Sequence, residues 1–215
     1  MKILMIVDHP YGLQASENVP HNRSYTAAQA AAAIRGLTSA GHEVDVIDLV
    51  ADGFDPVMRR EDLVAWRMKT VVDPISADYQ ARLMAADYLV FAFPIWWEAM
   101  PALTKGFLDK VLTKGVVYIE PDKPGLFING IPNVKGVALL TTMSTPGFLY
   151  RWLIGNPILK IMFRGTFRKI GVKKLRWLNA VNPAGKTQEQ REANLARLER
   201  EFASALVGEA AVPVH

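Results

Sequence analysis

Apolar residues gather into five short runs along the chain, and each run is followed by a polar or glycine-containing segment. A strand that is buried on both faces of a parallel sheet is typically a continuous apolar run bounded by turn-forming residues. The first, third and fourth runs are of this kind, and the second alternates between aliphatic residues and aspartate. The pattern predicts strands at residues 2–7, 43–49, 88–93, 136–142 and 175–180.

Helical patterns separate these strands. An alanine-rich segment at residues 24–40 begins at Ser24, a good N-cap, and is followed by Gly41, a good C′ residue. Further helices are predicted at 61–68, 76–86, 101–111 and 187–207, the last opening with a capping box of Thr187 and Gln190. This alternation predicts an α/β fold: one domain over residues 1–215, with a doubly wound five-stranded parallel sheet of order 2-1-3-4-5 and helices on both faces.

Two of the predicted loops follow the third and fourth strands, and open α/β sheets bind ligands beyond the carboxyl ends of their strands. The third strand is expected to end at Pro94, because proline cannot continue a central ladder, and Ile95, Trp96 and Trp97 follow it. Two adjacent tryptophans can cover a flat ligand, although core or dimer packing would explain them equally well. The loop after residue 142 contains small residues that let backbone N–H groups approach a ligand, but a plain turn-rich loop would look the same.

The loop between the first strand and the first helix is the third candidate. It carries His9, Asn22 and Arg23 and leads into Ser24. The unpaired N–H groups and the dipole at the start of a helix favour a bound anion. The loop lacks the G-x-G-x-x-G fingerprint and the lysine-containing phosphate loop of other nucleotide-binding folds. Without further information, Ser24 could be a helix cap only.

Composition narrows the chemistry. The chain has 215 residues, of which 50% are hydrophobic and 21% charged, as is typical of a globular protein. Its net charge of +4 gives little indication of nucleic-acid binding. It has no cysteine, and its histidines, His9, His21, His42 and His215, lack the spacing of metal ligands. We find no signal peptide or membrane-spanning stretch, so a cytoplasmic location is expected. Any redox chemistry would therefore come from a bound organic cofactor.

The residues around the twin tryptophans carry a resemblance to a known family. They read Phe93-Pro94-Ile95-Trp96-Trp97, Met100-Pro101-Ala102-Leu103, Lys105-Gly106-Phe107 and Asp109-Lys110-Val111. This string resembles the signature of flavodoxin-like NAD(P)H:quinone oxidoreductases, roughly F-P-[LI]-x-W-x-x-x-P-A-x-L-K-G-[FW]-x-[DE]-[RK]-V. The resemblance implies a ping-pong reaction in which hydride from NAD(P)H passes through a flavin to quinones, or to azo or nitro acceptors. It also implies FAD, with FMN as the alternative, and a homodimer with its active site at the subunit interface.

The resemblance assigns roles to individual residues. Ser24, Tyr25 and Thr26 match three positions that hold the flavin phosphates, and His9 matches a histidine near them. Tyr150 matches a tyrosine that handles substrate and hydride, and is therefore the candidate catalytic residue, although the family histidine that follows has no counterpart here. The other implied contacts are to the flavin ring from Pro94, Ile95, Trp96, Trp97, Thr141, Thr142 and Met143, and to the adenine side from Asp109 and Arg191.

Some of these assignments depart from the family pattern. Met143 and Ser144 replace two family glycines. Arg191 could equally be a surface arginine opposite the neighbouring glutamates. Trp66, in the short helix predicted at 61–68, is a candidate for packing at a dimer interface.

Two other functions fit part of the sequence. A non-enzymatic flavin electron carrier would share the fold, but such carriers tend to be acidic and this chain is basic. An accessory protein of a membrane ion-efflux system could dock through the aromatic and basic segment 148–176. That segment suits an anionic membrane surface, but core packing and subunit contact explain it as well and are favoured.

Overall fold

The structure is a computed structural model that describes residues 1–17, 23–122, 125 and 127–204. Three residues discussed above, His21, Asn22 and His215, lie outside the described residues, as does the predicted end of the last helix near residue 207.

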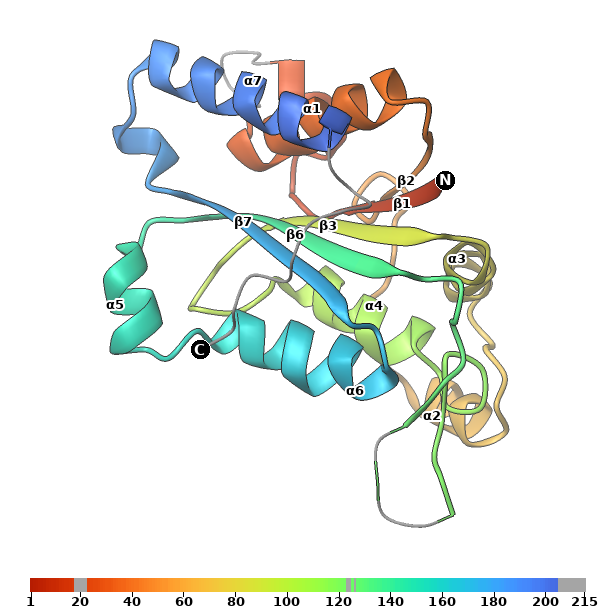
Figure 1. Ribbon diagram of the computed structural model, residues 1–215. Coiled ribbons are helices and arrows are strands. Elements are labelled where there is room, and N and C mark those ends of the chain that lie inside the picture. The colour runs from red at the N-terminus through yellow and green to blue at the C-terminus, as the bar shows by residue number, and fades with distance from the viewer. Residues whose placement is uncertain (18–22, 123–124, 126, 205–215) are drawn as a thin grey trace.

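A five-stranded parallel sheet forms the centre of the fold, in the order β2-β1-β3-β6-β7 (Figure 1). Its strands are β1 (Lys2–Val7), β2 (Glu43–Asp48), β3 (Tyr88–Pro94), β6 (Gly136–Met143) and β7 (Lys174–Val181). Every residue of β3 and β6 is buried, as expected for central strands covered on both faces. The predicted fold class and strand order are confirmed.

Helices form a layer on each face of the sheet (Figure 1). One layer contains α1 (Tyr25–Ser39) and α7 (Gln188–Ser204), and the other contains α3 (Pro74–Met84), α4 (Ala102–Val111), the π-helix η2 (Leu159–Phe167) and α6 (Arg168–Ile170). Successive side chains of a strand point to opposite faces, so β1 contributes to two cores. Ile3 and Met5 pack with α1 and α7, whereas Leu4 and Ile6 pack with α3, α4 and η2.

Smaller elements complete the fold. They are η1 (Leu13–Glu17), α2 (Arg60–Arg67), the antiparallel pair β4 (Tyr118–Ile119) and β5 (Ile128–Asn129), α5 (Gly147–Trp152) and η3 (Pro183–Gly185). The strands β4 and β5 pair antiparallel, with Tyr118 opposite Asn129. Among the described residues, no helix combines the length and the apolar character that crossing a bilayer requires.

The predicted helix caps are present. The Ser24 hydroxyl accepts the N–H of Ala27 at 3.1 Å, and Gly41 has the positive φ of a residue that ends a helix. Thr187 and Gln190 exchange both bonds of the capping box, at 3.1 and 3.2 Å.

Several element boundaries differ from the prediction by one or two residues, and two of these differences have a clear local cause. β3 extends through Pro94, which pairs with Thr142, because the last residue of a strand can lack an N–H donor without loss to the ladder. α3 starts at Pro74, two residues earlier than predicted, because the Asp73 carboxylate accepts the N–H groups of Ile75 and Ser76 at 3.3 Å each.

The aromatic and basic segment 148–176 divides into two parts on either side of Pro157. In the second part, Ile158, Met162, Phe163 and Phe167 are buried in the core, as the packing interpretation predicts. In the first part, Phe148, Trp152 and Leu153 are exposed, so packing within the chain does not account for them. They lie on and just after α5, a helix whose only buried residue is Tyr150.

Candidate functional site

The carboxyl ends of β1, β3 and β6 and the start of α1 meet in one corner of the molecule. The N–H of Asp8, just past β1, donates to the carbonyl of Ala92 in β3 at 2.9 Å. The hydroxyls of Thr26 in α1 and Thr142 in β6 are hydrogen-bonded at 2.9 Å. The predicted residues Ser24, Thr26 and Thr142 are therefore brought together beside the unpaired N–H groups of a 15-residue helix, an arrangement that favours an anion.

The loop between β3 and α4 is constrained and presents its tip outward. Trp96 and Ala99 exchange two backbone hydrogen bonds of 3.0 Å, and Trp97 and Glu98 between them have φ of +49° and +62°. Non-glycine residues rarely adopt such angles, and strain of this kind is concentrated at functional sites. Within the described part of the chain, the N–H groups of Trp97 and Glu98 have no hydrogen-bond partner. The loop can therefore offer backbone donors to a ligand.

Ile95 and Trp97, two of the residues predicted to contact a flavin ring, differ sharply in exposure. Ile95 is buried and donates its N–H to the Thr142 carbonyl at 2.7 Å. Trp97 is 99% exposed and Trp96 is 46% exposed. The indoles thus do not fill the core of this chain, which leaves a flat ligand or a dimer contact as the explanation for the tandem tryptophans.

Thr141 and Met143 lie at the end of β6 and are buried. The Thr141 hydroxyl donates to Asn179 Oδ1 at 2.7 Å and accepts from Trp177 Nε1 at 2.8 Å. Both partners belong to β7, so the Thr141 side chain fixes the neighbouring strand and only its backbone is left to contact a ligand.

Tyr150 is fully buried, and both functions of its hydroxyl are used. The hydroxyl donates to the Glu98 carbonyl at 3.1 Å and accepts the N–H of Ile158 at 3.1 Å. Burial raises the pKa of Tyr150 to about 12, so the hydroxyl keeps its proton at neutral pH. In this arrangement the side chain supports the β3–α4 loop, and its predicted role in handling substrate stays a prediction.

A cavity of about 470 Å3 lies between α1, α7 and the segment before α1. We call it the α1–α7 cavity; its lining includes Arg23, Ser24, Tyr25, Pro183 and Arg191. The Tyr25 hydroxyl donates to the Arg191 carbonyl at 3.2 Å, and burial raises the pKa of Tyr25. The Arg191 guanidinium is held by the Lys186 carbonyl at 2.6 Å and by Gln188 Oε1 at 3.0 Å. Three of the predicted residues, from segments far apart in sequence, therefore line one hollow.

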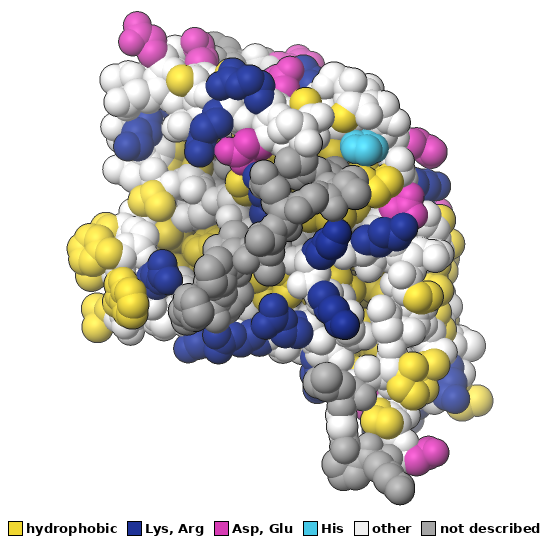
Figure 2. Space-filling model, in the orientation of Figure 1, with side chains coloured by type: hydrophobic (Ala, Val, Ile, Leu, Met, Phe, Trp, Pro, Cys, Tyr) yellow, Lys and Arg dark blue, Asp and Glu magenta, His cyan; other side chains and the backbone are white. Residues whose placement is uncertain are grey.

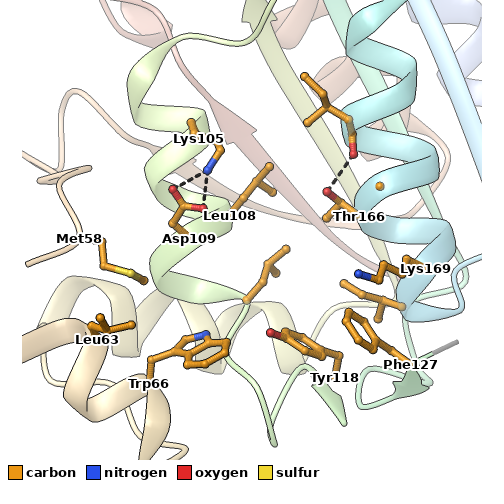
Figure 3. A pocket seen from close by; sticks show the side chains of 14 residues that line it. Met58, Leu63, Trp66, Lys105, Leu108, Asp109, Tyr118, Phe127, Thr166 and Lys169 are labelled. Carbon is orange, nitrogen blue, oxygen red and sulfur yellow. Dashed lines mark hydrogen bonds and ion pairs between the residues drawn. The ribbon is translucent and has the colours of Figure 1, made fainter. Parts of the chain in front are cut away.

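Asp109 lies elsewhere. It lines a second cavity, of about 430 Å3, on the other face of the sheet (Figure 3). We call this the α4–α6 cavity; its lining includes Trp66, Leu108, Asp109, Tyr118, Phe127 and Lys169. Asp109 is paired with Lys105 at 2.5 Å, Tyr118 and Phe127 are stacked at 4.5 Å, and the Lys169 amine lies 4.2 Å from the Phe127 ring centre.

His9 and Asp8 follow β1 directly. Burial lowers the pKa of His9, whose Nδ1 accepts the N–H of Tyr11 at 3.2 Å. Asp8 was not identified from the sequence, yet its buried carboxylate accepts both the N–H and the hydroxyl of Thr104, at 2.7 and 2.6 Å. Asp8 thereby ties the end of β1 to the first turn of α4, and its sequence signal was an aspartate placed immediately after an apolar strand.

Glu98 was also missed. Its Oε1 accepts the Thr145 hydroxyl at 2.7 Å, while its Oε2 is buried without a hydrogen-bond partner among the described residues. A buried acceptor of this kind needs a donor, which a ligand can supply. The described residues contain no group of three or more histidine, aspartate or glutamate side chains placed to hold a metal ion.

Comparisons with known proteins identify the family to which this chain belongs. The family model of the flavodoxin-like fold matches residues 1–204, and the chain belongs to that family. The ribosyldihydronicotinamide dehydrogenase [quinone] of Rattus norvegicus is 26% identical over 195 residues, which cover 81% of this chain and 83% of the rat enzyme. The matched part spans 59% of the length of the enzyme of that name from Pongo abelii, at 28% identity. The resemblance found in the sequence is therefore confirmed.

Two solved structures share the fold. An NAD(P)H:quinone oxidoreductase from Methanothermobacter marburgensis has a TM-score of 0.79 at 22% identity, covering 95% of this chain and 98% of its own. An FMN-dependent NADH-azoreductase from Bacillus anthracis, solved in complex with FMN, has a TM-score of 0.74 at 14% identity, covering 96% of this chain and 99% of its own. At these identities the likeness concerns the fold.

Proposed function

We propose that this protein is an NAD(P)H-dependent flavin oxidoreductase that reduces quinones, or azo or nitro compounds, by two electrons. The observation that carries the proposal is the corner where three features meet: the start of α1, the strained β3–α4 loop and the end of β6. When bound, the flavin supplies the two-electron chemistry, accepting a hydride equivalent from the nicotinamide and passing it to the acceptor. The chain's own residues bind, orient and shield that group.

The phosphate side of the flavin is assigned to α1. Ser24, Thr26 and the N–H groups of the first turn bind the phosphates, with Arg23 adding positive charge, and Arg191 lines the adenine side of the same cavity. The size of this cavity beyond the helix start supports FAD, whose adenine half needs room that FMN does not. FMN remains the alternative.

The ring side is assigned to the β3–α4 loop. The N–H groups of Trp97 and Glu98 face developing negative charge, which preorganised donors stabilise in a site that excludes water. The exposed Trp96 ring shields that site, and Tyr150 holds the loop through the Glu98 carbonyl. Thr142 and the backbone of Met143 border the ring from β6.

The assembly is proposed to be a homodimer. Arg191 and Asp109, both assigned to the adenine side, line cavities on opposite faces of one chain. A single flavin can contact both Arg191 of one chain and an Asp109 if that Asp109 belongs to a second copy of the chain. The apolar lining of the α4–α6 cavity, which includes Trp66, suits such a contact.

The test is NAD(P)H oxidation by the flavin-loaded protein with a water-soluble quinone. Turnover supports the proposal; a protein that binds flavin but does not turn over with quinone, azo or nitro acceptors contradicts it and favours the electron carrier. Ser24→Ala should weaken flavin binding by about tenfold, because it removes a hydroxyl beside the phosphates. Ser39→Ala, which removes a hydroxyl bonded to Gly36 at the other end of α1, is the matched control and should leave flavin binding unchanged.

A further inference from the structure

The surface around α5 is unusually apolar for a solvent-facing part of a protein. Phe148, Trp152 and Leu153 are 66%, 78% and 80% exposed, and Tyr150 of the same helix anchors them from beneath. Scattered apolar residues on a surface need no explanation, but a contiguous group of large ones marks an interaction site. Figure 2 shows hydrophobic side chains gathered at the left edge of the molecule, over α5.

The tip of the β3–α4 loop belongs to the same surface. Glu98 is bonded to the α5 region twice, through its carbonyl to Tyr150 at 3.1 Å and through its carboxylate to Thr145 at 2.7 Å. Trp97, the residue before it, is almost fully exposed. We call Trp97, Phe148, Trp152 and Leu153 the aromatic ridge. Because the two segments are hydrogen-bonded together, the ridge is held in place beside the loop assigned to the flavin ring.

Apart from the Glu98 carboxylate, which is bonded to Thr145, the charged side chains of the segment that carries α5 are basic. The printed sequence contains no aspartate or glutamate between Asp122 and Glu189, while Lys and Arg recur throughout that stretch. The Arg151 guanidinium lies 5.2 Å from the Trp152 ring centre, and Lys160 and Arg168 are exposed on η2 and α6. Lys and Arg side chains also follow the lower edge of the molecule next to the apolar group (Figure 2). Tryptophan and phenylalanine flanked by basic residues are typical of surfaces that lie in the headgroup region of anionic bilayers.

We propose that the aromatic ridge and the basic residues beside it dock the protein onto an anionic lipid bilayer. A second copy of the chain is the other candidate occupant. A twofold contact would place the ridge and its basic surroundings against the same positive charges, which is unfavourable. Anionic lipid headgroups complement that charge, and the acyl boundary accepts the indole and phenyl rings.

Docking would bring the β3–α4 loop to the membrane surface. Resting on the function proposed above, the acceptor class is then a lipid-dissolved quinone, in the balanced reaction NAD(P)H + H+ + quinone → NAD(P)+ + quinol. The nicotinamide would arrive from the aqueous side and the quinone from the bilayer.

The experiment is flotation of the flavin-loaded protein with two kinds of vesicle: phosphatidylcholine alone, and equal parts of phosphatidylcholine and phosphatidylglycerol. The protein should float with the mixed vesicles only, and salt of about 1 M, which shortens the Debye length to about 3 Å, should weaken binding. Trp152→Ser and, independently, Leu153→Ser should each lower the partition coefficient by about tenfold. Met68→Ser, at an exposed methionine just after α2, is the matched control and should bind as the wild type does.

The docking proposal would be overturned if the wild-type protein floated with neither kind of vesicle, or if the ridge variants bound vesicles as well as the wild type does. It would also be overturned if the ridge variants bound vesicles normally and sedimentation showed instead that they no longer form a dimer. Turnover with a water-soluble quinone is measured in parallel and should be unchanged in Trp152→Ser and Leu153→Ser. Absence of that turnover in the wild type would contradict the proposed function but not the vesicle binding, so the two failures are distinguishable.

Discussion

The α1–α7 cavity and the α4–α6 cavity are similar in size but differ in the polar groups that line them. The first is lined by arginine, serine and tyrosine at the start of a helix, a setting for a charged group. The second is lined mostly by apolar and aromatic side chains around one exposed ion pair, a setting for burial against another surface. Residues assigned to one cofactor are divided between them. In the homodimer proposed above, one chain would therefore supply two half-sites on opposite faces of its sheet.

The largest expected effect on stability concerns Lys110, which lies on the α4 side of the sheet. The buried Lys110 amine on α4 lies 3.0 Å from the Asp73 carboxylate and 3.0 Å from the Asp55 carbonyl, and so joins three segments. Lys110→Met should lower the free energy of unfolding by about 3 kcal/mol, because it leaves a partly buried carboxylate without its partner. Chemical denaturation measures this.

Lys105→Met is the control on the same helix. Its ion pair with Asp109 is largely exposed, so the loss should be below about 0.5 kcal/mol. Equal losses of unfolding free energy in Lys110→Met and Lys105→Met would contradict a larger contribution from the buried ion pair of Lys110.

A second pair of variants compares the close backbone packing of α1 and α4, the helices that contribute to the two cavities. A Cβ at Gly36 of α1 would lie 2.2 Å from the Glu199 carbonyl of α7, and one at Gly106 of α4 would lie 2.4 Å from the Pro56 backbone. Each alanine should cost about 2 kcal/mol by forcing the backbones apart. Gly36→Ala should disturb flavin binding through the α1–α7 cavity, and Gly106→Ala should disturb dimer formation through the other. Gly147→Ala, whose Cβ would meet only Val181 at 3.8 Å, is the packing control.

The smallest effect concerns Asp8, the link between β1 and α4. Burial raises the pKa of Asp8, although the bonds from Thr104 oppose the rise. Because the pKa of Asp8 is higher in the folded protein, the unfolded chain loses this proton at lower pH than the folded protein does. The stability that the protonated Asp8 contributes is therefore fully present below the unfolded pKa and is lost as the pH rises through the folded pKa. Asparagine does not titrate, so the stability of Asp8→Asn relative to wild type should increase from acid to neutral pH. If the difference in stability between Asp8→Asn and the wild type did not change with pH, the raised pKa of Asp8 would be contradicted.

The repeating pattern of the chain predicted the fold well because burial of β3 and β6 on both faces requires continuous apolar runs. Ser24 and the Thr187–Gln190 capping box were predictable because caps are local chemistry. The earlier start of α3 at Pro74 depends on equally local chemistry, the Asp73 cap, which the prediction did not include.

The site was predicted less completely, because its key contacts join residues far apart in sequence. The bonds of Asp8 to Thr104 and of Tyr150 to Glu98 depend on which loops meet at the sheet edge, and no spacing rule encodes them. The separation of Asp109 from Arg191 follows from the side of the sheet to which each helix packs. Exposure of Phe148, Trp152 and Leu153 could not be read from composition, because buried Ile158, Met162 and Phe163 follow in the same segment.

The most direct measurement is titration of FAD and FMN into Arg191→Ala, Asp109→Ala and an equimolar mixture of the two after subunit exchange. Each variant alone should bind FAD about tenfold more weakly than wild type and bind FMN normally. In the mixture, each mixed dimer regains one intact site, so about a quarter of all sites should recover wild-type FAD affinity. Wild-type FAD affinity in both variants, or a mixture with weak sites only, would contradict a flavin held between two copies of the chain.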